Sequence, residues 1–179
     1  MILKTKLFGH TYEFKSLREV MAKANEEKSG DKLAGIAAED AQERVAAKVV
    51  LSHITLNEIR NNPAVPYEED EVTRIIQDAV NETTFAQFKN MTVAELREWL
   101  LDERTDGEMI RRASRGLTRE LVAAVCKLMS NLDLIYAAKK MRVSAHCNTT
   151  IGLPGTFSSR LQPNHTTDDP KGIIASVME

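Results

Sequence analysis

Residues 92–100, Thr92-Val93-Ala94-Glu95-Leu96-Arg97-Glu98-Trp99-Leu100, carry the pattern that decides the fold class of this chain. A threonine followed three residues later by a glutamate is a capping box, in which each side chain accepts a hydrogen bond from the other residue's backbone N–H at a helix start. Apolar residues then follow at helical spacing. We expect a mainly helical domain, because the same pair of residue types recurs at Ser16 with Glu19 and at Thr55 with Glu58.

Further helices are expected on both sides of this stretch, where apolar residues repeat at helical spacing. They cover residues 41–52, residues 68–89 as one long helix, and a last helix that opens at Thr118. The side chains expected to face the core are Val45, Val49 and Leu51 in the first helix, Val72, Ile75, Ile76, Ala79 and Val80 in the second, and Val122, Val125, Met129 and Leu132 in the third.

The N-terminus is expected to form a small β-hairpin. Residues 2–8 and 11–14 are rich in apolar and aromatic residues, and Gly9-His10 between them is the predicted turn. The hairpin and the helices together give a predicted domain of residues 1–145.

The composition changes near residue 140. Residues 148–157 are rich in Thr, Gly and Pro and are typical of a strand or extended chain, which residues 158–162 could continue. Asp168 and Asp169 before Pro170 then predict a helix start. A strand, a loop and a helix are the first βα unit of a larger fold. A complete (β/α)8 TIM barrel takes about 250 residues, so residues 146–179 are expected to be the beginning of an incomplete barrel.

Composition and charge exclude several classes of protein. The 179 residues are 42% hydrophobic with a formal net charge of −2, which is an ordinary globular balance. Nucleic acid is not an expected partner, because phosphate binding needs clustered Lys and Arg; the one tight basic cluster, Arg111, Arg112 and Arg115, is interpreted as a solvated helix end. A membrane is not expected either, since no apolar run approaches the roughly 20 residues of a span.

The cysteines and histidines show no metal-ligand spacing. Cys126 lies in the apolar run 121–129 and is expected to be buried and inert, whereas Cys147 lies far from it. Two unpaired cysteines indicate a reducing cytoplasm. The four histidines are scattered, so no metal site is expected: His10, His53, His146 and His165.

Residues 155–163, Gly155-Thr156-Phe157-Ser158-Ser159-Arg160-Leu161-Gln162-Pro163, are the strongest candidate for a functional site. If this stretch is extended, Ser158, Arg160 and Gln162 point to one face. Charged and amide groups facing inward need a partner or ligand, and the end of a barrel strand is where active-site residues gather. The alternative is an exposed loop in which Arg160 is simply solvated.

From these residues outward, the whole chain resembles the large-subunit family of ethanolamine ammonia-lyase. The resemblance rests on matches that run in order without visible gaps, among them residues 22–26, 42–48, 59–63, 80–83, 133–136, 138–141, 148–152, 154–158 and 160–164.

The resemblance implies a fold and a reaction. The fold is a helical N-terminal region followed by a (β/α)8 barrel. The reaction is the radical conversion of ethanolamine to acetaldehyde and ammonia with adenosylcobalamin as cofactor. Arg160 and Gln162 match substrate-contacting positions of the family on the first barrel strand, and Arg160 is the expected catalytic residue. Cobalamin contacts come mostly from later strands, so none is assigned here.

The same resemblance implies partners and a location. The partners are ethanolamine, the small subunit and further copies of the large subunit, and the location is the cytoplasm within a bacterial microcompartment. Because the barrel is incomplete, the 179-residue chain alone is expected to be inactive. Two alternatives stay open: a non-catalytic helical module for interaction or oligomerisation within the same complex, and another barrel enzyme with a helical extension.

Overall fold

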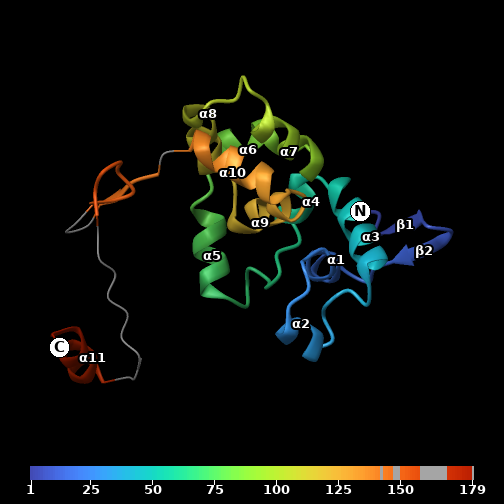
Figure 1. The fold of residues 1–179 in the computed structure, drawn as a ribbon, viewed down its shortest axis with the longest axis horizontal. Helices are drawn as coiled ribbons and strands as arrows, with labels where there is room; N and C mark the ends of the chain where they lie inside the picture. Colours follow the sequence, from blue (N-terminus) through green and yellow to red (C-terminus); the bar gives the residue numbers. More distant parts are fainter. Residues whose placement is uncertain (142, 147–149, 158–168, 179) are drawn as a thin grey trace. The chain divides into compact units, whose positions relative to one another are not determined.

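The computed structural model describes residues 1–141, 143–146, 150–157 and 169–178. The chain divides into two units, Met1–Met141 and Arg142–Glu179 (Figure 1). The first unit begins with β1 (Lys4–Leu7) and β2 (His10–Glu13). Its helices are α1 (Leu17–Lys23), α2 (Ser29–Leu33), α3 (Ala41–Ser52), α4 (Leu56–Arg60), α5 (Glu71–Asp78), α6 (Glu82–Phe88), α7 (Val93–Leu101), α8 (Gly107–Ala113), the 3₁₀ turn η1 (Ser114–Gly116), α9 (Arg119–Lys127) and α10 (Asn131–Lys140).

The predicted hairpin is confirmed, with a different turn. β1 and β2 pair antiparallel so that Leu7 lies opposite His10, and the two turn residues are therefore Phe8 and Gly9. Both have positive φ, 53° and 80°. Two-residue hairpin turns with positive φ at both positions match the twist of the flanking strands. His10 belongs to β2, and the hairpin lies beside α3 (Figure 1).

The capping boxes at Thr55 and Thr92 are confirmed, and the two helix starts lie side by side. The Thr92 N–H donates to Glu95 Oε2 at 2.7 Å, and the Glu95 N–H donates to Thr92 Oγ1 at 3.2 Å. A bridge joins Thr55 to Thr92. Ser16 also caps its helix, but the Glu19 carboxylate accepts from the Lys15 N–H instead. Side-chain caps of this kind each stabilise a helix by about 0.5–2 kcal/mol.

The core of the first unit lies between α1, α3, α4, α6, α7 and α9. The apolar faces of these helices meet there, and Phe88 packs edge-on against Trp99 with ring centroids 5.2 Å apart. The largest completely buried side chains are Leu51, Leu56, Ile59, Leu96, Leu121, Val20 and Val93.

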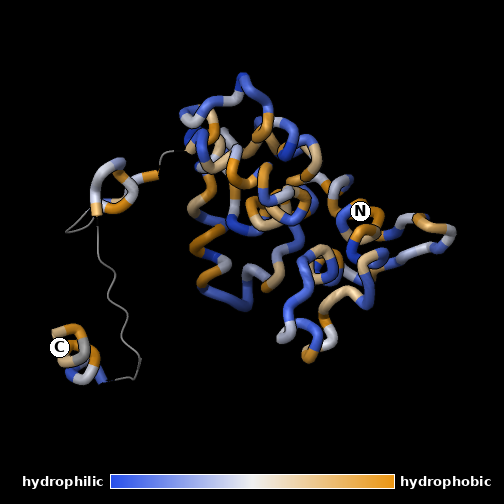
Figure 2. Tube along the Cα trace, viewed as in Figure 1, coloured by the Kyte–Doolittle hydropathy of each residue, from blue (hydrophilic) through white to orange (hydrophobic). Residues whose placement is uncertain are grey.

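The predicted long helix at 68–89 is wrong: it is two helices, α5 and α6. Asn81 begins α6, because its Oδ1 accepts from the Thr84 N–H at 2.9 Å while its own N–H donates to the Arg115 carbonyl at 2.8 Å. Asn is among the residues that favour this N-cap position. The break turns α5 outward, so Val72 and Ile75 are 58% and 61% exposed rather than buried. The hydrophobic residues of α5 appear in orange in Figure 2.

The predicted last helix is also divided, into α9 and α10. Ser130 accepts from the Asp133 N–H at 3.2 Å, and Asp133 accepts from the Ser130 N–H at 3.0 Å, so a further capping box starts α10. Val125 is buried as predicted, but Val122 and Leu132 are exposed. Val45 in α3 is exposed too, although Leu51 of the same helix is buried. The predicted buried stripe from Val122 to Leu132 on one continuous helix is therefore wrong.

Two contacts hold the end of α10. Lys140 Nζ donates to the backbone carbonyls of Leu100, at 3.0 Å, and Asp102, at 2.6 Å. On the other side, Gly107 packs so tightly against the Lys140 carbonyl that a Cβ atom on this glycine would overlap it. The last turn of α10 is thereby fixed to the connection between α7 and α8.

In the second unit, β3 (Ala145–His146) and β4 (Thr150–Ile151) pair antiparallel. The described residues that follow form a bend and a turn, with positive φ at Gly152 and Gly155. Of the extended chain predicted over 148–157, β4 is confirmed, while residues 148–149 and the continuation over 158–162 lie outside the described residues. The predicted helix is confirmed as α11 (Pro170–Met178), where the Lys171 N–H donates to Asp169 Oδ1 at 3.0 Å. A parallel barrel strand and the domain boundary at 145/146 stay predictions. Within the described residues, no helix has the length and apolar character of a membrane span.

Candidate functional site

The predicted site residues Arg160 and Gln162 lie outside the described residues, as do Ser158 and His165. Their shared face, and the alternative of an exposed loop, both stay predictions. Among the hollows in the described part of the first unit, two have three basic side chains each in their lining.

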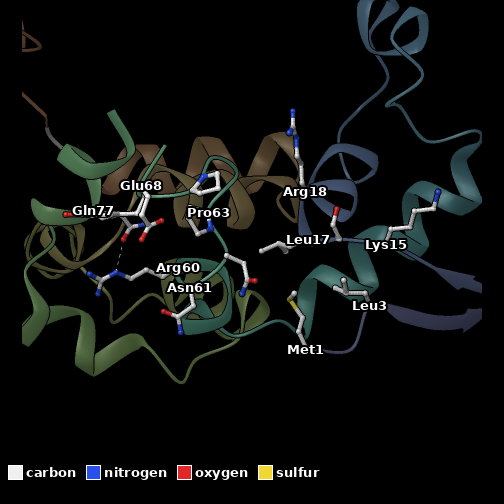
Figure 3. A pocket seen from close by; sticks show the side chains of 14 residues that line it. Met1, Leu3, Lys15, Leu17, Arg18, Arg60, Asn61, Pro63, Glu68 and Gln77 are labelled. Atoms are coloured by element: carbon white, nitrogen blue, oxygen red, sulfur yellow. Dashed lines mark hydrogen bonds between the residues drawn. The ribbon is translucent and has the colours of Figure 1, made fainter. Parts of the chain in front are cut away.

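The larger hollow, of about 780 Å³, lies between the start of the hairpin, the start of α1 and the loop that follows α4. Figure 3 shows Arg60 pointing toward Gln77 on one side, with Lys15 and Arg18 on the other. Glu68 is the acidic residue of its lining, and Met1, Leu3 and Pro63 are among the apolar ones. The lining therefore mixes charged and apolar side chains, and Arg60 is the cation in it with the most hydrogen bonds.

Each nitrogen of the Arg60 guanidinium has a protein partner. Its Nε donates to Gln77 Oε1 at 3.1 Å, and its two terminal nitrogens form a bidentate pair with the Glu82 carboxylate. Its guanidinium also lies 4.5 Å from the centre of the Phe85 ring. The hydrogen bonds with Glu82 raise the pKa of Arg60 and lower the pKa of Glu82. Through these contacts Arg60 joins α4, α5 and α6, so we interpret it as a structural residue rather than a ligand-binding one.

The smaller hollow, of about 380 Å³, lies between the end of α1, α3, the end of α9 and the start of α10. Three lysines line it: Lys28, Lys48 and Lys127. Cys126 lines it too and is exposed, which corrects the prediction of a buried thiol: α9 turns this residue away from the core that Val125 enters. Partial burial still raises the pKa of the Cys126 thiol. The lysines come from separate segments, so no spacing in the sequence could have revealed them.

Neither hollow has in its lining a histidine that could ligate the cobalt of a cobalamin. No group of three or more His, Cys, Asp or Glu side chains among the described residues could hold a metal ion. In the larger hollow, Arg60 is already engaged by Gln77 and Glu82. No chemical step is therefore assigned to these residues.

Comparison with known proteins identifies the family. The family model "Ethanolamine ammonia lyase large subunit (EutB)" matches residues 12–179. The chain is 59% identical over all 179 residues to the ethanolamine ammonia-lyase large subunits of Escherichia coli K12 and O157:H7, and 58% identical to that of Salmonella typhimurium strain LT2. It spans 40% of the length of each of these relatives. The chain belongs to the ethanolamine ammonia lyase large-subunit family, as the resemblance predicted.

Proposed function

We propose that the complete protein to which these residues belong is the catalytic subunit of a carbon–nitrogen lyase that converts ethanolamine to acetaldehyde and ammonia. The observation that carries the proposal is 59% identity, over every residue of the chain, to a relative named as an ethanolamine ammonia-lyase large subunit. Adenosylcobalamin, when bound, supplies the radical chemistry, while a protein of this kind supplies positioning and electrostatics. The name "large subunit" supports a small-subunit partner, and we further propose association with other large subunits and a place in a bacterial microcompartment.

Arg160 and Gln162 are proposed to bind the substrate in different ways. An arginine is always cationic and only donates hydrogen bonds, so Arg160 avoids the ammonium group of ethanolamine and donates to its hydroxyl oxygen. The amide carbonyl of Gln162 accepts a hydrogen bond from the ammonium group. Each residue thereby recognises one end of the substrate.

The test replaces Arg160 with alanine in the complete enzyme with its small subunit. A hydrogen bond to a charged group is worth about 1.5–3 kcal/mol, so kcat/KM for ammonia release should fall about ten- to a hundred-fold. Arg160→Lys should restore part of the loss, because a point charge lacks the planar fork of donors. Arg104→Ala is the matched control, since this arginine is exposed and pairs with Asp102. Wild-type kinetics in Arg160→Ala, with a lower Tm, would show that Arg160 is structural.

A second role is proposed for the described part of the chain: a non-catalytic scaffold of the same complex. The first unit has its own core, and α10 presents Leu132 and Ile135, 74% and 59% exposed, where a scaffold would contact neighbours. As a further arm of the same assay, the 179-residue chain with small subunit and adenosylcobalamin should release no ammonia above background. Ammonia release by this chain would contradict a role that is only that of a non-catalytic scaffold.

A further inference from the structure

Three lysine side chains converge on the smaller hollow of the first unit. Lys28 immediately precedes α2, Lys48 lies on α3, and Lys127 is the last residue of α9. All three line the same space of about 380 Å³. Because they come from three segments far apart in the sequence, the fold itself brings their charges together.

Carboxylates neutralise the positive charge of this hollow only in part: Glu26 lies in its lining, and Asp31 acts electrostatically on Lys127. Within the described residues, none of the three lysines forms an ion pair, whereas nearby Lys23 pairs with Glu43 at 2.5 Å and with Glu19 at 3.4 Å. One acidic residue, Glu26, also lines the hollow. The lining therefore carries a net charge of about +2 when the side chains have their usual ionisation.

Two of the three lysines are more constrained than ordinary surface lysines, whereas Lys28 is exposed. Lys48 and Lys127 are both partly buried, and Lys127 Nζ donates a hydrogen bond to Asn25 Oδ1. Burial lowers the pKa of Lys127, and the positive charges of Lys28 and Lys48 act in the same direction, whereas Cys126 and Asp31 act against it. A bound anion would relieve this repulsion without moving the lysines.

We propose that this hollow binds a phosphate group, either as inorganic phosphate or as the phosphate of a small monoester. A phosphate monoester carries about −1.5 to −2 charge at pH 7, which matches the excess charge of the lining. Lysine binds phosphate as a point charge, and the side-chain amides of Asn25 and Asn131 line the same space and can donate hydrogen bonds. The volume falls within the range of about 300–1,000 Å³ typical of small-molecule sites, which leaves room for an organic group beside the phosphate.

The experiment measures binding to the 179-residue chain by calorimetry in a phosphate-free buffer. The ligands are inorganic phosphate, glycerol 3-phosphate and glycerol, with potassium chloride added to equal ionic strength. Saturable binding of the two phosphates and none of glycerol is the expected result. Tighter binding of glycerol 3-phosphate than of inorganic phosphate identifies a monoester as the occupant, and the reverse order identifies free phosphate.

Lysine variants test whether this hollow is the site. Lys48→Met and Lys127→Met should each weaken phosphate binding about ten- to a hundred-fold, the loss expected for a hydrogen bond to a charged group. Lys127→Arg should retain most of the affinity. Lys4→Met removes the same charge from an exposed strand residue, and should leave the affinity unchanged. An absence of saturable binding, or equal weakening in Lys4→Met, would overturn the proposal; far-ultraviolet circular dichroism confirms that each variant is folded.

Discussion

Replacing Arg60 with methionine removes a guanidinium that joins three helices while it keeps most of the apolar length of the side chain. The Arg60 side chain is only 14% exposed, whereas its partner Glu82 is 70% exposed. Because one partner is exposed to solvent, the ion pair contributes at most about 1 kcal/mol to the free energy of unfolding. The hydrogen bond to Gln77 adds about 1 kcal/mol, and the cation–π contact with Phe85 about 0.5–1 kcal/mol. Since the three contacts share one group, we expect a total loss of about 2–3 kcal/mol.

The assay is urea denaturation of the chain followed by circular dichroism, with a thermal melt beside it. For a unit of this size, 1 kcal/mol corresponds to about 4 °C in Tm, so Arg60→Met should lower Tm by about 8–12 °C. Arg74→Met is the matched control, because Arg74 pairs with Glu71 on the exposed surface of one helix and should lose less than about 0.5 kcal/mol. A double-mutant cycle with Glu82→Gln isolates the ion pair. If Arg60→Met were as stable as Arg74→Met, the structural role of Arg60 would be refuted.

Two further predictions concern the first unit. Hydrogen bonds from Arg111 hold the pKa of Glu108 at about 2, below its usual 4.5. The stabilisation from this interaction should therefore be complete above about pH 4.5 and lost as the pH falls toward 2. A carboxyl-carbon NMR titration of Glu108 with a midpoint near 4.5 at low salt would contradict this. Gly116→Ala should destabilise the unit by about 1–3 kcal/mol, because the new Cβ would lie 2.6 Å from the Phe85 backbone nitrogen. Gly30→Ala, which meets nothing within 4 Å, should leave the urea midpoint unchanged or raised.

Local signals in the sequence predicted the helix starts better than the helix lengths. A capping box is a contact between residues three apart, so Thr55 and Thr92 could be identified without knowledge of the fold. The breaks at Asn81 and Ser130 were missed because apolar spacing continues across them. Asn81 in particular is fixed by the Arg115 carbonyl, a tertiary contact that no local pattern encodes.

Burial was hardest to predict where a helix lies at the edge of the core. The apolar spacing of α5 is that of a buried face, yet Val72 and Ile75 are exposed, since spacing shows which residues share a face but not what covers that face. The residues of the two hollows could not be predicted from sequence spacing for the same reason. Arg60 and the lysine cluster depend on partners 17 or more residues away, whereas Arg160 and Gln162 were proposed from neighbouring positions of one strand and a family resemblance.

The two contacts at the end of α10 have a mechanical consequence. Lys140 is tied through Nζ to the carbonyls of Leu100 and Asp102, and its own carbonyl lies against Gly107. Tension on the backbone beyond Met141 would therefore pass directly into the connection between α7 and α8 rather than unwind the final turn of α10. These contacts hold the last turn of α10 against the residues between α7 and α8.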